Sequence, residues 1–123
     1  MIVSVLVRRL KEGRTYDDFV AEWEADEGFG VPTRVFAAQS LEDPRDVITI
    51  GFVAASPDEL TEWSAAASAP EAVRHARIDT VIESTELRAF YELGGEFDFT
   101  ASPRRIAAGS PESLLGALAA PGR

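Results

Sequence analysis

Several residue types that carry chemistry are absent or scarce in this 123-residue chain, which has no cysteine, no asparagine and a single histidine. Without cysteine the chain cannot form disulfides, thiolate metal sites or a cysteine nucleophile. The single histidine, His75, excludes nearly all multi-histidine metal centres, so we expect no metal site. No run reaches the roughly 18 to 20 apolar residues that a membrane-spanning helix needs, so none is predicted.

Positive charge is also scarce. The chain has 12 basic residues against 21 acidic ones, a net charge of −9, and Lys11 is its only lysine. A chain this acidic repels the phosphates of nucleic acids and the surface of anionic membranes, so we expect neither as a partner. The opening residues MIVSVLVRRL place their charges after the apolar stretch, the reverse of a secretory signal, which predicts a cytoplasmic protein.

Length and charge distribution predict one folded domain followed by an appendage, because 123 residues is near the commonest domain size. Residues 94–123 carry equal numbers of acids and bases, so residues 1–93 hold the whole net charge. From Gly94 onward the composition shifts to glycine, proline, serine and alanine. We therefore predict a domain over 1–93 and an appendage over 94–123, where a Ser-Pro pair followed by leucines predicts a short helix at 111–120.

Residues 1–93 contain six segments with the features of strands or helices. The strand segments are rich in β-branched and aromatic residues, and the helix segments begin with an N-cap residue followed by acids. We predict strands over Ile2–Val7, Thr33–Leu41, Val47–Ala54 and Leu87–Leu93. We predict one helix that begins after the N-cap Thr15 and is ended by Gly28 and Gly30. We predict a second helix that begins at Ser56 and Pro57, is interrupted at Pro70 and ends at about Ile82. This order, β-α-β-β-α-β, predicts an α+β ferredoxin-like fold with a four-stranded antiparallel sheet.

The apolar patterning of two strands predicts that the sheet is covered on both faces. Two helices in this fold cover only one face, yet Ile2–Val7 is apolar on both. In the third predicted strand, Ile48, Ile50 and Phe52 alternate with residues no more polar than threonine. On a monomer, an uncovered apolar face of that size would be an exposed hydrophobic patch prone to association. We therefore predict a homodimer that packs sheet against sheet.

This element order, the turn EDPRD at 42–46 and the helix opening SPDELTEW at 56–63 resemble the dimeric α/β-barrel superfamily. Within it, the chain is most similar to antibiotic-biosynthesis-monooxygenase-like proteins. The resemblance covers roughly residues 1–93 and implies that two ferredoxin-like subunits close their sheets into a shared barrel. The superfamily includes monooxygenases, isomerases, ligand-sensing domains and members of unassigned activity, so the fold by itself does not fix the chemistry.

The resemblance implies a small-molecule site in a cleft between sheet and helices, where cofactor-independent monooxygenases place a tryptophan of the second helix. Such enzymes need an aromatic or polyketide-like substrate that reduces oxygen once deprotonated, together with a base and an oxyanion donor, and no cofactor. The residues expected to carry catalysis are His75 as base, with Arg77 and Tyr91 as donors. Those expected to bind the substrate are Trp63, Trp23, Phe36, Phe52 and Arg88.

Two alternatives remain open at the level of sequence. Haem-degrading members of the fold combine a tryptophan with an iron-ligating histidine, and Trp63 and His75 form such a pair here, although the asparagine of those enzymes is missing. The other alternative is a non-catalytic ligand-binding or assembly dimer, because Trp63 lies three residues after Leu60, where a core residue is also expected.

Overall fold

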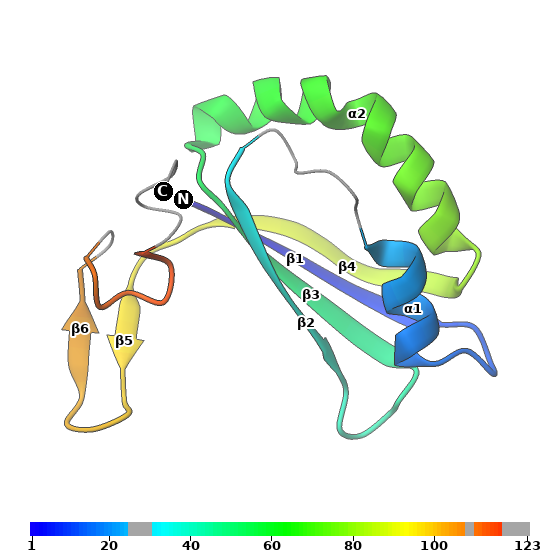
Figure 1. Ribbon diagram of the computed structural model, residues 1–123, viewed down its shortest axis with the longest axis horizontal. Helices are drawn as coiled ribbons and strands as arrows, with labels where there is room; N and C mark the ends of the chain where they lie inside the picture. The colour runs from blue at the N-terminus through cyan, green and yellow to red at the C-terminus, as the bar shows by residue number, and fades with distance from the viewer. Residues whose placement is uncertain (25–30, 108–109, 117–123) are drawn as a thin grey trace.

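The protein is built on a four-stranded antiparallel sheet with two helices on one face (Figure 1). The computed structural model describes residues 1–24, 31–107 and 110–116, except for the side chains of residues 63–70. The elements of the sheet layer and helix layer are β1 (Ile2–Leu10), α1 (Tyr16–Trp23), β2 (Thr33–Gln39), β3 (Asp46–Val53), α2 (Pro57–Asp79) and β4 (Ile82–Glu92). The strand order is β2-β3-β1-β4 with antiparallel neighbours, which confirms the predicted ferredoxin-like fold.

Both helices start where the N-cap patterns predict. Thr15 Oγ1 accepts a hydrogen bond from the backbone N–H of Asp18 at 3.2 Å, and the Asp18 carboxylate accepts one from the backbone N–H of Thr15 at 2.9 Å. Ser56 and Glu59 form the same reciprocal pair, with both distances at 3.2 Å, and Pro57 is the first helical residue of α2. These capping boxes satisfy backbone donors that would otherwise lack partners, so each fixes a helix start.

The helix ends are less well predicted. α2 is continuous for 23 residues through Pro70, so the predicted interruption there is wrong. Proline removes one helical hydrogen bond, and the helix curves over the sheet without breaking (Figure 1). The chain is already extended at Ile82, which pairs with Leu10 of β1, so the helix ends earlier than predicted. α1 also ends earlier than predicted, at Trp23 with Glu24 as its C-cap, and the predicted end at Gly28 and Gly30 lies outside the described residues.

The two faces of the sheet differ in what covers them. Along β3, residues 47, 49, 51 and 53 are buried beneath the helices, whereas the alternate residues are half-buried. The main core cluster on this helix-facing side consists of Leu10, Phe19, Val47, Ile78, Val81 and Ile82. The opposite face, here called the open face, carries Val3, Val5, Val7, Phe36, Ile48, Ile50, Phe52, Leu87, Ala89 and Tyr91. Phe36, Leu87 and Tyr91 are exposed by 47%, 42% and 53% there, so the face is apolar and uncovered within one chain.

The appendage contains a hairpin that the sequence analysis did not predict, formed by β5 (Glu96–Asp98) and β6 (Arg104–Ile106) at one end of the sheet (Figure 1). The Asp98 carboxylate accepts hydrogen bonds from the Thr100 hydroxyl at 2.6 Å and from Arg104 Nε at 3.1 Å. Hydrogen bonds from Thr100 and then from Arg104 lower the pKa of Asp98 to about 2. Of the helix predicted at 111–120, residues 111–115 form turns and 117–120 lie outside the described residues.

The capping box of α2 gives a stability prediction. Replacing Ser56 by alanine removes the acceptor for the backbone N–H of Glu59, so we expect the free energy of unfolding to fall by about 1 kcal/mol. Urea denaturation followed by circular dichroism measures the change. Thr61→Ala, at an exposed position inside the same helix, serves as the control. A loss in Ser56→Ala no larger than that in the control would contradict the capping assignment.

Candidate functional site

The structure divides the predicted site residues between the two faces of the sheet. His75 and Trp23 belong to the helix layer, and Arg88 lies on the helix-facing side of β4, opposite Leu6 of β1. Tyr91 pairs with Val3 and therefore lies on the open face. The predicted site residues thus do not form one constellation.

Phe36 and Phe52 require a correction, because the prediction placed them in the cleft beneath the helices. Phe36 pairs with Ile50, and Phe52 lies in the half-buried set of β3 that alternates with the buried Val47 set, so both belong to the open face. Their rings meet edge to face with centroids 6.0 Å apart. The physical reason is the two-residue period of a strand, which assigns every second side chain to the opposite face.

Arg8 of β1 is the most unusual polar residue on the helix-facing side. The residue is 5% exposed, its guanidinium carbon lies 5.8 Å from the centre of the Phe19 ring, and its Nη1 has no hydrogen-bond partner in the described structure. The pairing of β1 with β4 shifts register between Val7 and Arg8. The extra residue, Glu86, belongs to β4, and the pairing of β1 with β3 stays regular at Arg8.

Burial, together with the positive charges of Arg74 and Arg88, lowers the pKa of Arg8 from 12.5 to about 10, whereas Asp79 and Glu71 act in the opposite direction. The guanidinium is therefore still charged at neutral pH. Arginines thus gather on the helix-facing side of an otherwise acidic protein. An anion is the ligand that such a cluster favours.

Arg74 ties α2 to α1. Its Nε donates a hydrogen bond to the Trp23 backbone carbonyl at 2.8 Å, and its guanidinium carbon lies 4.8 Å from the centre of the Trp23 ring. Its Nη1 lies 3.1 Å from the Glu71 carboxylate. Arg74 thereby anchors Trp23 beside the cluster, and burial lowers the pKa of Arg74.

His75 is the candidate base of this cluster. Its Nε2 lies 3.2 Å from a Glu71 carboxylate oxygen, and its side chain is 28% exposed. Burial lowers the pKa of His75 below 6.5, and the charges of Arg88, Arg8 and Arg74 act in the same direction. Glu71 raises the pKa but does not reverse the shift. The imidazole is therefore largely neutral at pH 7, the form that can accept a proton.

The helix-facing side is open to solvent beyond Arg8. Arg88 is exposed, and Phe90, two residues along the same side of β4, is exposed by 46%. Across the strands, Phe90 pairs with Ser4, and Ser4 pairs with Gly51. The row beside Arg88 thus has small residues at its centre, and Gly51 in this row is buried beneath the helices.

Two other predicted residues are placed differently. Arg77 is exposed and its Nη2 donates to the backbone carbonyl of Glu24 at 3.2 Å, next to the Trp23 carbonyl that Arg74 binds. Trp63 lies in α2 between Leu60 and Pro70, but its side chain lies outside the described structure. The sequence analysis did not select Arg8, although its even position along β1, shared with the buried Ile2 and Leu10, could have revealed it.

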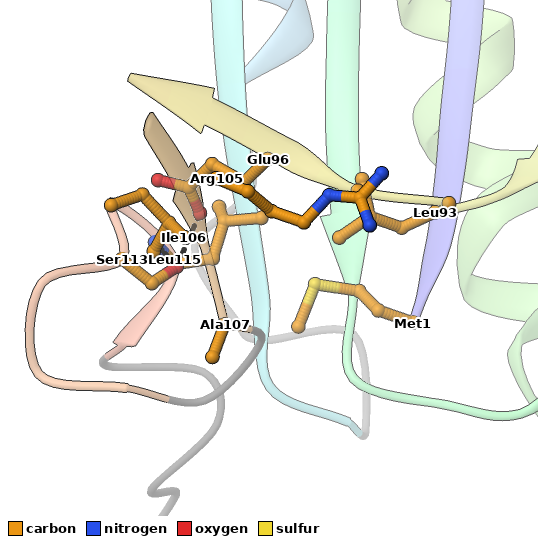
Figure 2. A pocket seen from close by; sticks show the side chains of 10 residues that line it. Met1, Leu93, Glu96, Arg105, Ile106, Ala107, Ser113 and Leu115 are labelled. Carbon is orange, nitrogen blue, oxygen red and sulfur yellow. Dashed lines mark hydrogen bonds between the residues drawn. The ribbon is translucent and has the colours of Figure 1, made fainter. Parts of the chain in front are cut away.

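A concavity lies between the N-terminus and the appendage. It has a volume of about 480 Å³, and Met1, Leu93, Arg105, Ile106 and Leu115 line much of it (Figure 2). Glu96 at its edge is already engaged, because it accepts hydrogen bonds from the Ser113 hydroxyl at 2.6 Å and from the backbone N–H of Leu114 at 3.1 Å. We call this concavity the tail cavity. Its lining contains no histidine, so it offers no base comparable with His75.

Groups with metal-binding or membrane-spanning character are not found in the described part of the chain. No cluster of three or more histidine, aspartate or glutamate side chains there could hold a metal ion. No helix of that part is both long and apolar enough to cross a membrane.

Comparison with known proteins identifies the fold. No protein-family model matches the chain, and no curated protein matches it. A solved structure from Chloroflexus aurantiacus J-10-fl, described as a candidate antibiotic biosynthesis monooxygenase, superposes with a TM-score of 0.50. It is 16% identical, and the match covers 77% of this chain and 95% of that one. The chain has the ferredoxin-like fold of antibiotic biosynthesis monooxygenase-like proteins. At this identity the likeness concerns the fold and leaves the chemistry to be argued from the residues.

Proposed function

We propose that this protein is a cofactor-independent monooxygenase that oxidises an aromatic or polyketide-like substrate on the helix-facing side of its sheet. The observation that carries the proposal is the half-buried His75 imidazole of α2, which lies 3.2 Å from Glu71 and whose pKa is lowered by burial and by the charges of Arg88 and Arg8. A base next to fixed positive charge favours substrates that become anions during reaction. The fold shared with a candidate antibiotic biosynthesis monooxygenase supports this choice of reaction.

The proposed reaction converts an activated methylene group of the substrate into a carbonyl group. His75 takes one proton from the methylene carbon, and the resulting carbanion spreads its charge onto a conjugated oxygen near Arg88. The carbanion gives its electron pair to dioxygen, and the peroxide anion receives the proton back from His75. The hydroperoxide then loses water. One oxygen atom ends in the carbonyl group and the other in water, so one dioxygen is consumed per substrate.

The test is oxygen uptake with a hydroxylated anthrone as the probe substrate. The wild-type protein in metal-free buffer is expected to consume one dioxygen per anthrone and to form the corresponding quinone faster than buffer alone. Under nitrogen the anthrone should persist. An equal rate with and without protein would contradict the proposal and would favour the non-catalytic ligand-binding dimer.

Haem binding through His75 is tested with the same protein by adding haemin. The His75 Nε2 atom is engaged with Glu71, and an iron ligand would need that contact to break. We therefore expect no histidine-dependent Soret shift. A shift that disappears in His75→Ala would overturn the cofactor-independent proposal.

We propose in addition that the working form is a homodimer. Antiparallel sheets that face water normally alternate apolar and polar residues, yet the open face is apolar along β1 and β3. Phe36, Leu87 and Tyr91 add exposed apolar surface to it from β2 and β4. A second copy of this chain, with the same face, is a self-complementary cover.

A further inference from the structure

The burial of Arg8 costs free energy that no contact in the described structure fully offsets, so a role in folding does not explain it. A guanidinium removed from water costs free energy unless its N–H groups are paired, and replacing such a group by an apolar side chain often stabilises a protein. Arg8 is 5% exposed, and its Nη1 has no hydrogen-bond partner in the described structure. The stacking on Phe19 satisfies the face of the guanidinium but none of its N–H groups.

We infer that Arg8 binds the carboxylate of an aromatic acid, whose ring lies over Leu6 and Phe90 on the helix-facing side of the sheet. A planar guanidinium with an unpaired N–H matches a carboxylate, which accepts two parallel hydrogen bonds. The inference uses the site of the proposed function and narrows its substrate to an acid, but it does not depend on oxygen chemistry.

The surroundings of Arg8 fit this ligand. Leu6 and Arg8 lie on the same side of β1, and Arg88 of β4 pairs with Leu6, so a second guanidinium flanks the apolar floor. Phe90, two residues after Arg88 on the same side of β4, has an exposed ring that can contact the ring of the ligand.

The charges that face Arg8 come from two other elements. α2 supplies Arg74 together with the acids Glu71 and Asp79, and β4 supplies Arg88. The unpaired Nη1 of Arg8 among these arginines favours an anion as the ligand.

The test compares naphthoate with naphthamide, which has the same ring but no charge, by isothermal titration calorimetry on the full chain. We expect wild-type protein to bind naphthoate at least tenfold more tightly. Arg8→Met should lose this preference while it still binds naphthamide, and its melting temperature should stay the same or rise. A merely structural Arg8 would instead give a lower melting temperature and an unchanged preference.

Arg105→Met is the matched control, because Arg105 lines the tail cavity, where an aromatic acid could also dock. Its naphthoate preference should equal that of the wild type. If Arg8→Met does not fold, Arg8→Lys keeps the charge without the planar fork and should give a reduced preference. Equal affinity of wild-type protein for both probes, or a preference lost in Arg105→Met instead, would overturn the inference. If the protein prefers naphthoate but takes up no oxygen, the proposed monooxygenase function is contradicted and the inference about Arg8 still holds.

Discussion

Replacement of His75 by glutamine is expected to lower kcat for the hydroxylated anthrone by a factor of about 10² to 10⁴. Glutamine keeps a polar side chain of similar length but cannot accept a proton at neutral pH. The neutral imidazole is available for this step because burial and the neighbouring guanidiniums lower the pKa of His75. Oxygen uptake under saturating anthrone measures the effect.

A charge change away from the site provides the control for this experiment. Arg14→Ala removes an exposed guanidinium from the turn before α1 and should leave the rate unchanged. Circular dichroism should show the same fold for both variants. If His75→Gln kept the wild-type rate, His75 would not be the base.

The pH dependence distinguishes a titrating base from a merely polar residue. Activity should be constant at neutral pH and fall as the pH drops through the pKa of His75, which lies below 6.5. Glu71 raises that pKa, so Glu71→Gln should move the acidic limb to lower pH. A profile of kcat/KM against pH measures the shift. An unchanged acidic limb in Glu71→Gln would assign the titration to another group.

The second large effect concerns assembly. Wild-type protein at micromolar concentration should have twice the mass of the 13.3-kDa chain, and Phe36→Asp should have the mass of one chain. Phe36 is 47% exposed on the open face, so an aspartate there remains solvated in the monomer but would be desolvated in a sheet-against-sheet dimer. Size exclusion with light scattering measures both masses.

Leu41→Asp is the matched control for assembly. Leu41 is fully exposed in the turn after β2, outside the open face, so this variant should remain a dimer. A monomeric wild type, or a dimer that survives Phe36→Asp together with Leu87→Lys, would contradict packing through the open face.

The local rules predict the helix starts and the element order. Thr15 with Asp18 and Ser56 with Glu59 are recognisable because a capping box depends on residues three positions apart. Those contacts need no tertiary structure. The ferredoxin-like order follows from them and from the β-branched runs between them.

Long-range packing decides what the local rules miss. Pro70 normally breaks a helix, yet α2 continues through it, and Ile78 and Val81 beyond it are buried in the core. Ile82 has an apolar neighbourhood that suits either a helix or a strand, and its pairing with Leu10 across the chain selects the strand. The strands of the β5–β6 hairpin have three residues each, which is too short for an alternation of apolar and polar residues to be recognised in the sequence.

The site is harder to predict than the fold, because it depends on which face each strand residue takes. The resemblance placed Phe36 and Phe52 in the cleft without a strand register, and the two-residue period of β2 and β3 puts both on the open face. Parity with Ile2 and Leu10 does indicate that Arg8 points beneath the helices. The unpaired state of its Nη1 atom, however, can be known only from the folded structure.

The central claim is that an aromatic acid binds at Arg8 on the helix-facing side of the sheet. A crystal structure of the protein with bound naphthoate tests this claim most directly, since it shows where the ligand lies. The helix-facing site predicts the carboxylate within hydrogen-bond distance, about 3 Å, of the Arg8 guanidinium, with the ring over Phe90. Naphthoate found only in the tail cavity beside Arg105, or only on the open face, would contradict it.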